Sequence, residues 1–255
     1  MNTHEFVTDI YLIHCITPMH PGSGDNNFGE IDNLIQRDPA SGLPVIYSST
    51  LKGAIKEYCR QDPMPEFNAI FGISGTDNED DEGSSVQQSI AGKCRFFTAD
   101  LLALPVQGIN VPYYLTSHNE IIGDVNKKLK LLGAALNWDA AFSETDTDLN
   151  YEIKGRLFTT PILRETELYH TSDFNSGIAK YLPVISRNQL ENGESQNLWY
   201  EEIIPRESRF VFAVSVFESD LALLIALRDK INGKLIQIGA NASIGYGYCK
   251  IEKIN

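Results

Sequence analysis

Runs of β-branched and aromatic residues recur along the chain and predict its strands. The first run is residues 6–17 (FVTDIYLIHCIT), and the clearest is residues 209–217 (RFVFAVSVF). Shorter strands are predicted at residues 43–47, 93–98, 109–115, 152–158, 163–169 and 245–254. So many separate strands indicate a fold built around a sheet.

Three segments carry apolar residues at helical spacing instead. Residues 49–60, with the core LKGAIKEY, show this spacing, and further helices are predicted at residues 120–136 and 220–231. The pair Asn232–Gly233 ends the last of them. Helices that interrupt the strands in this order favour an α+β fold, in which an antiparallel sheet carries helices on one face.

Length and composition suit one domain. Of the 255 residues, 42% are hydrophobic, which is enough for a packed core. Residues 74–85 (SGTDNEDDEGSS) contain acidic residues but no lysine or arginine, and residues 170–197 are polar and turn-rich. We therefore expect a single domain over residues 1–255, with a flexible acidic loop at about 74–90 and an inserted lobe at about 170–197.

The formal net charge of −13 argues against nucleic acid, because phosphate binding usually leaves a basic surface. The acidic segment carries part of the excess, and the remaining body can still hold basic grooves. Charge alone therefore leaves RNA binding open.

Signals of export, membrane insertion and zinc binding are missing from the sequence. The longest apolar run, LALLIAL, is far shorter than the roughly 20 residues that span a bilayer. The N-terminus lacks the basic segment of a signal peptide, and the cysteines and histidines show no zinc-site spacing. The sequence predicts a cytoplasmic protein with no membrane contact and with reduced, buried cysteines.

The segment SSTLKG places two serines and a lysine at the start of a predicted helix. Ser48 and Ser49 stand where an N-cap belongs, and the first N–H groups of a helix point outward without partners. Lys52 replaces the acid of a capping box, so the first turn suits a phosphate. A plain serine cap with a solvated lysine explains the same residues.

A glycine-rich segment, IGANASIGYGY, precedes the last predicted strand. Gly239, Gly245 and Gly247 allow the backbone to approach a ligand closely or to adopt positive φ. The segment is not a dinucleotide-binding motif, because no helix follows it. The alternative is a tight loop with a glycine in an edge strand.

The segment SGDNNFGEIDNLIQRDP gathers carboxylates next to cations. Counted from Asp25, Glu30 occupies the position at which a calcium-binding EF-hand loop needs glycine. His20 and Arg37 flank Asp32 and can pair with phosphate. A charged surface loop and a two-carboxylate hydrolase site both remain open.

The segment WYEEIIPRES contributes two adjacent aromatic residues. Trp199 and Tyr200 can stack on bases, although aromatic residues beside a strand more often belong to the core.

The order of these motifs resembles the RAMP superfamily of CRISPR-Cas proteins. The matching segments are HPGSG, IDNLIQRDPASGLP, SSTLKGAIK and IGANASIGYG, and they span nearly the whole chain. Within the superfamily, the chain is most similar to the repeated backbone subunit of type III effector complexes. IFG, AGK, LPV and above all WYEEIIPRES narrow the resemblance to type III-B.

The resemblance implies an RRM-like, ferredoxin-type core, with the lobe at residues 170–197 as a projecting thumb. Copies of the chain would stack along a CRISPR guide RNA with other type III-B effector subunits, and each thumb would wedge between guide and target RNA. The residues that the resemblance places at RNA are His20, Arg37, Ser48, Ser49, Lys52, Lys56, Gly239, Asn241, Gly245, Tyr246 and Gly247.

For catalysis, the resemblance points to Asp32, the aspartate of the family pattern i-D-x-x-i-x-R, which cuts target RNA. Asp32 would bind a divalent ion, Mg²⁺ or Mn²⁺, or assist deprotonation of the ribose 2′-OH, whose attack leaves a 2′,3′-cyclic phosphate. Asp25 and Asp38 are nearby alternatives. Because each stacked subunit completes only part of a site, we expect an isolated chain to be nearly inactive.

Three positions depart from the family pattern. Ile46–Tyr47 stand where proline and glycine are usual, Lys56 replaces an arginine, and Ala240 replaces a second glycine. The alternative functions are a repeat-RNA processing endonuclease of the same superfamily, a non-catalytic guide-binding scaffold, and an acidic calcium-binding protein.

Overall fold

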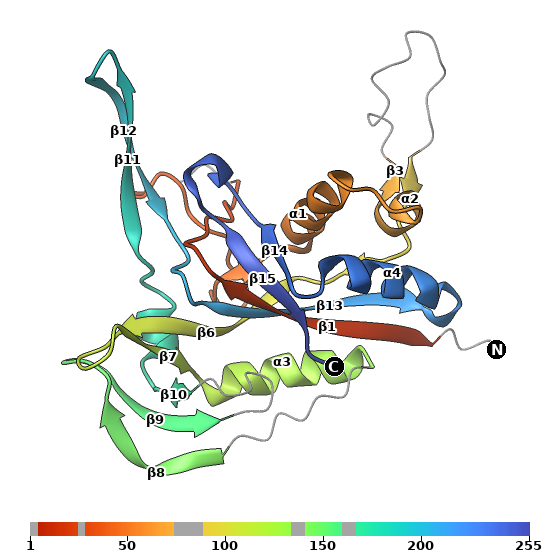
Figure 1. Ribbon diagram of the computed structural model, residues 1–255. Coiled ribbons are helices and arrows are strands. Elements are labelled where there is room, and N and C mark those ends of the chain that lie inside the picture. Colours follow the sequence, from red (N-terminus) through yellow and green to blue (C-terminus); the bar gives the residue numbers. More distant parts are fainter. Residues whose placement is uncertain (1–4, 25–28, 74–88, 134–140, 160–166) are drawn as a thin grey trace.

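A computed structural model of the chain describes residues 5–24, 29–73, 89–133, 141–159 and 167–255 (Figure 1). Its helices are α1 (Ser48–Arg60), α2 (Phe67–Phe71), α3 (Asn119–Leu131) and α4 (Leu221–Ile231), with shorter helical turns at Phe174–Ile178, Glu218–Asp220 and Ala242–Ile244. Its strands are β1 (Phe6–Cys15), β2 (Val45–Ile46), β3 (Gly72–Ile73), β4 (Ile90–Ala91), β5 (Arg95–Phe96), β6 (Ala99–Gln107), β7 (Tyr113–Ser117), β8 (Ala141–Asp148), β9 (Lys154–Thr159), β10 (Leu168–His170), β11 (Val184–Glu191), β12 (Glu194–Glu202), β13 (Arg209–Phe217), β14 (Lys234–Gln237) and β15 (Tyr248–Lys253).

The centre of the molecule is a ferredoxin-like unit. In the main sheet the strands β15, β1, β13 and β6 lie side by side in that order, and each neighbouring pair is antiparallel. In chain order they alternate with helices as β1–α1–β6–β13–α4–β15, which is the ferredoxin arrangement. The predicted α+β class with an antiparallel, ferredoxin-like sheet is confirmed.

The central strands are buried on both faces, so the prediction of helices on one face only is wrong. Tyr11 of β1 lies in one core cluster with Leu51 of α1 and Leu224 of α4, whereas Ile10 belongs to a second cluster with Val125 of α3. Since consecutive residues of a strand point to opposite faces, α3 covers the face opposite α1 and α4 (Figure 1). Helical periodicity shows that a helix has an apolar side, but it does not show which face of a sheet that side covers.

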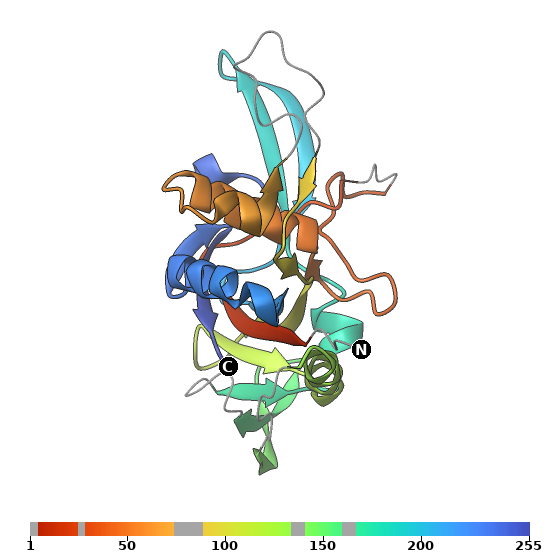
Figure 2. The same ribbon diagram turned by 90° about the vertical axis from the view of Figure 1, so that its right-hand side faces the viewer.

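A long insertion separates the second and third ferredoxin strands. Between β6 and β13 the chain adds β7, β10, β9 and β8 beyond β6, with β10 parallel to β7 and the other pairs antiparallel. It then forms the hairpin β11–β12, which stands away from the sheet in both views (Figures 1 and 2). The lobe predicted at residues 170–197 contains β11 and the start of β12, and the hairpin continues to Glu202, which pairs with Val184.

The predicted elements are present with shifted ends, but the sequence analysis missed the strands β6, β8, β11, β12 and β14. The helix predicted at residues 120–136 is α3, and the strand predicted at residues 163–169 is β10; residues 134–136 and 163–166 lie outside the described residues. Asp25 and the acidic loop up to residue 88 also lie outside the described residues.

The four cysteines are free and buried, as predicted. Within the described ranges, no helix is long and apolar enough to cross a membrane.

Candidate functional site

Asp32 lies at the foot of the β11–β12 hairpin. Its side chain is exposed, and its Oδ2 accepts the backbone N–H of Tyr200 at 2.8 Å. The Asp32 N–H donates to the Tyr200 carbonyl at 3.1 Å, and Asn33 continues the contact as a parallel bridge to Glu201. The carboxylate is therefore accessible to a ligand, yet it is held against β12.

Glu202 ties the segment that carries Asp32 to the hairpin. Only 4% of Glu202 is exposed, and its carboxylate forms an ion pair with Arg37 and accepts the N–H of Ile35 at 3.3 Å. Its carbonyl accepts a hydrogen bond from Nδ1 of His20 at 2.7 Å. One buried acidic residue thus joins three points of the segment from residue 20 to residue 37.

Arg37 is engaged within the protein. Besides pairing with Glu202, its guanidinium donates to the carbonyls of Gly42 at 2.9 Å, Ala179 at 2.8 Å and Lys180 at 3.3 Å. These bonds place Arg37 between the opening segment and the start of the hairpin. Its contact with RNA stays a prediction, and its observed role is to fix the site's geometry.

His20 and the glycine-rich loop are packed against each other. His20 is buried, and its carbonyl accepts the N–H of Ala240 at 2.9 Å. A Cβ at Gly239 would lie 2.6 Å from the His20 oxygen, and one at Gly247 would collide with a neighbouring carbonyl, so both positions require glycine. Gly245 also has positive φ but faces open space, which leaves its backbone accessible.

Glu201 connects the hairpin to the same loop from the other face of β12. Only 6% of Glu201 is exposed; its carboxylate accepts hydrogen bonds from Trp199 Nε1 at 2.8 Å, Arg187 Nε at 3.2 Å and Asn241 Nδ2 at 3.0 Å. Arg187 also stacks over the ring of Tyr246, 4.6 Å from its centre. Burial alone would raise the pKa of Glu201, but the hydrogen bonds from Trp199 and Arg187 outweigh it and hold the pKa below its ordinary value.

Helix α1 begins one residue earlier than predicted. Tyr47 is its N-cap, no side chain caps it, and Ser48 and Ser49 occupy the first helical positions, so the prediction of a serine cap is wrong. The first N–H groups have no intrahelical partners. Lys52, half-buried, follows in the same turn without any acidic residue there, and Lys56 lies one turn later, near the ring of Phe67.

Gln36 explains why the serine cap is not needed, and sequence reasoning missed it. Its side-chain oxygen accepts the Tyr47 N–H at 2.6 Å, and its Nε2 donates to the Thr50 hydroxyl at 2.7 Å and the Gly22 carbonyl at 3.0 Å. Gln36 is buried, so these bonds lock the start of α1 to the opening segment. A glutamine directly after the apolar pair Leu34–Ile35 was the available signal.

Asp38, the alternative catalytic residue, stabilises a turn at residues 38–41 through its side chain. Its Oδ1 accepts the N–H groups of Ser41 at 2.8 Å and Ala40 at 3.1 Å and the Ser41 hydroxyl at 2.9 Å. The backbone hydrogen bond from Ser41 is the main reason that the pKa of Asp38 lies below its ordinary value. The carboxylate is thus committed to local structure.

The residues present are compatible with a divalent ion bound jointly with RNA. Among the described residues, no group of three His, Cys, Asp or Glu side chains is arranged to hold a metal ion. Mg²⁺ often takes only one or two carboxylates and completes its shell with water and substrate phosphates. Asp32 alone can supply such a carboxylate.

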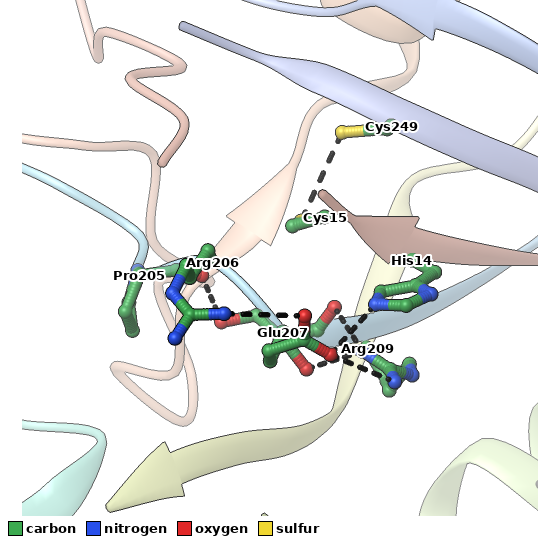
Figure 3. A network of polar contacts seen from close by, with 8 residues as sticks. His14, Cys15, Pro205, Arg206, Glu207, Arg209 and Cys249 are labelled. Atoms are coloured by element: carbon green, nitrogen blue, oxygen red, sulfur yellow. Dashed lines mark hydrogen bonds and ion pairs between the residues drawn. The ribbon is translucent and has the colours of Figure 1, made fainter. Parts of the chain in front are cut away.

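A second polar network joins the segment between β12 and β13 to His14 of β1 (Figure 3). Nε2 of His14 donates to Glu207 at 2.8 Å, and Arg209 contacts the same carboxylate at 3.3 Å. Burial and the nearby Arg209 charge lower the pKa of His14. Burial would raise the pKa of Glu207, but the hydrogen bond from His14 and the charge of Arg209 outweigh it and lower that pKa.

Comparisons with known proteins agree on one family. The profile of the RAMP superfamily matches residues 12–250. The chain is 27% identical over 287 aligned residues to the CRISPR system Cmr endoribonuclease Cmr4 of Pyrococcus furiosus, covering 94% of each protein.

Solved structures show the same fold. A chain in the cryo-EM structure of the type III-B Cmr-beta complex bound to cognate target RNA matches with a TM-score of 0.74 at 20% identity, covering 98% of both chains. The crystal structure of oligomeric Cmr4 from Pyrococcus furiosus matches with a TM-score of 0.61 at 20% identity, covering 97% of this chain and 99% of that one.

Proposed function

This chain belongs to the RAMP superfamily, and on that premise we propose that it is the repeated backbone subunit of a type III-B CRISPR effector complex, where it binds guide RNA and cuts target RNA. The observation that carries the proposal is the exposed Asp32 carboxylate fixed to the hairpin, in a chain similar along 94% of its length to a Cmr endoribonuclease. Its partners are guide RNA, target RNA, further copies of itself and other effector subunits, in the cytoplasm.

Guide RNA is bound through its backbone at two places. The start of α1 offers the N–H groups of Ser48 and Ser49, which have no partner within the helix, beside the charge of Lys52, a combination that suits phosphate. The loop around Gly245 offers an accessible backbone. Gln36 and His20 hold these two places in a fixed relation to the segment that carries Asp32.

The cut follows from the position of Asp32 beside a splayed target nucleotide. Its carboxylate accepts the proton of the ribose 2′-OH as that oxygen attacks the adjacent phosphorus. The bond from phosphorus to the 5′-oxygen breaks, and that oxygen takes a proton from water, which leaves a 2′,3′-cyclic phosphate and a 5′-hydroxyl. A bound Mg²⁺ or Mn²⁺ supplies charge neutralisation at the phosphate. The hairpin determines which ribose reaches Asp32.

A guide-binding scaffold without catalysis is the second candidate. One observation favours it: Oδ2 of Asp32 already accepts the Tyr200 N–H, as a purely structural aspartate would.

One experiment separates the two candidates. Guide-loaded complexes are reconstituted with wild type, Asp32→Ala or Asp38→Ala, and target cutting is measured at equal assembly, with and without EDTA. We expect regularly spaced cuts from wild type and Asp38→Ala, and none from Asp32→Ala or after chelation. Unchanged cutting by Asp32→Ala would refute the catalytic assignment, and a wild-type complex that never cuts is a scaffold.

A further inference from the structure

Two adjacent buried acidic residues at the foot of the hairpin bind different parts of the molecule. Consecutive residues of β12 point to opposite faces, so Glu201 and Glu202 diverge. Glu202 binds Arg37 and Ile35 in the opening segment. Glu201 binds Asn241 in the glycine-rich loop. Glu201 and Glu202 are consecutive residues of the same strand, β12. Tyr200, whose backbone holds Asp32, directly precedes them.

Among the described residues, a short chain of contacts leads from the glycine-rich loop through Glu201 to Asp32. Asn241 reaches Glu201 through one hydrogen bond of 3.0 Å. The neighbouring Tyr200 then reaches Asp32 through its N–H and its carbonyl, and Asn33 forms backbone hydrogen bonds with the residues on either side of Glu201, Tyr200 and Glu202. A displacement of the loop therefore reaches the Asp32 carboxylate through two consecutive residues of β12, Glu201 and Tyr200.

Arg187 adds a second contact between the hairpin and the glycine-rich loop, but one of its nitrogens lacks a hydrogen-bond partner among the described residues. Its guanidinium bonds Glu201 through Nε and stacks on Tyr246 of the loop, so loop and hairpin share one cation. Its Nη2 is buried and has no hydrogen-bond partner among the described residues. A buried unsatisfied donor is unfavourable, so a shift of the loop that supplies an acceptor is favoured.

We propose that Glu201 is a positioning residue for the cut: it transmits occupation of the glycine-rich loop by guide RNA to the position of Asp32. The inference rests on the proposed function. Glu201 touches neither guide nor target. It sets how the segment that carries Asp32 lies when the loop is occupied, so it acts on the rate of cutting and not on the affinity for RNA.

Substitutions of Glu201 and of its partner Asn241 test the path at both ends. Glu201→Gln keeps the size of the side chain but leaves the charge of Arg187 without its counter-charge. Asn241 has φ +66, which glycine adopts freely, so Asn241→Gly removes only the amide donor and keeps the loop conformation and the Glu201–Arg187 pair. Glu194→Gln, at the exposed start of β12, is the matched control.

The readouts are kcat and KM for target cutting and the Kd for guide RNA, all measured in guide-loaded complexes at equal assembly. We expect kcat to fall about 10- to 100-fold in Glu201→Gln and Asn241→Gly, because small misplacements of a catalytic group have costs of this size, with KM and guide Kd within about twofold. Glu194→Gln should match wild type, and Arg187→Lys, which keeps the charge, should lie between.

Three outcomes overturn the inference. The first is cutting at the wild-type rate in Asn241→Gly, and the second is a fall no larger in Glu201→Gln than in Glu194→Gln. The third is a rise in guide Kd that matches the loss of kcat, which would make Glu201 a support for guide binding. If Glu201→Gln does not assemble, Asn241→Gly alone decides. Failure of the wild-type complex to cut would instead refute the proposed function.

Discussion

Asp32 and Tyr200 are joined by two hydrogen bonds through the Tyr200 backbone. Asp32 Oδ2 accepts the Tyr200 N–H at 2.8 Å, and the Asp32 N–H donates to the Tyr200 carbonyl at 3.1 Å. Because the contact does not use the tyrosine ring, it depends on the path of β12 and not on the identity of residue 200. One carboxylate therefore holds the hairpin and faces solvent at the same time.

Asp32→Asn separates these two tasks. The asparagine oxygen can accept the same N–H, so we expect the free energy of unfolding to change by less than about 0.5 kcal/mol, as for most exposed substitutions. Cutting of target RNA should fall at least about 100-fold, because an amide neither takes up the 2′-OH proton nor holds a cation well. Urea unfolding of the chain and single-turnover cutting by the complex give the two values. A loss of stability as large as that of Asp32→Ala would contradict the first expectation.

Gly239→Ala and Gly245→Ala differ only in their surroundings. Both glycines have φ near +85°, which costs an alanine about 1–2 kcal/mol. At Gly239 the new methyl group also meets the carbonyl of His20, so the loss of stability should be larger and should reduce guide binding. At Gly245 the methyl group meets open space. Equal unfolding free energies for the two variants would show that the contact between His20 and the loop is not maintained in solution.

Lys52→Ala tests the start of α1 as a phosphate site. Removing one phosphate contact should lower the slope of log K against log salt for guide binding by about 0.7–1. Lys127→Ala provides the control, because Lys127 is an exposed lysine of α3 that pairs with Asp124. Filter binding at several salt concentrations measures both slopes. An unchanged slope in Lys52→Ala places the phosphate contacts elsewhere.

The network of His14 and Glu207 predicts a loss of stability in acid. The folded state lowers the pKa of His14, so its contribution is complete above the ordinary value of 6.5 and is lost as the pH falls below it. The lowered pKa of Glu207 acts in the same direction, in the window below 4.5.

His14→Gln isolates the first window. Glutamine can still donate to Glu207 but does not titrate, so the difference in unfolding free energy between variant and wild type should change between pH 7 and pH 5. His170, whose pKa is also lowered by burial, stays in both proteins and cancels in the difference. Urea titrations at three pH values suffice, and parallel curves would exclude His14 as a contributor.

The sequence predicted those elements whose pattern is local. The runs of β-branched and aromatic residues in β1 and β13 and the helical spacing of apolar residues in α1 placed these elements correctly. The prediction that all helices lie on one face of the sheet was wrong for α3, because the pattern of an amphipathic helix does not show which face of the sheet it covers. The prediction of a serine N-cap was wrong because the N-cap is Tyr47, whose N–H donates to Gln36, eleven residues earlier in the chain.

The site was predicted less completely than the fold. The motif order, taken with the family resemblance, singled out Asp32 and the glycine-rich loop, but the partners of Glu201 and Glu202 lie up to 182 residues away along the chain. Their signal was two acidic residues followed by the apolar pair Ile203–Ile204. Only the fold shows that these carboxylates are buried and which donors they meet.

The helix α3 closes the sheet face that RRM proteins leave open. In those proteins aromatic side chains on the open face stack on individual bases. Here the corresponding positions of the central strands, Ile10, Leu12, Val211 and Ala213, are aliphatic and buried in the cluster that includes α3. With that platform covered, contact is left to loops and helix ends, which meet phosphate and ribose and carry no base preference. If the proposed function holds, we expect such a chain to accept a guide of any sequence and to leave the choice of target to base pairing.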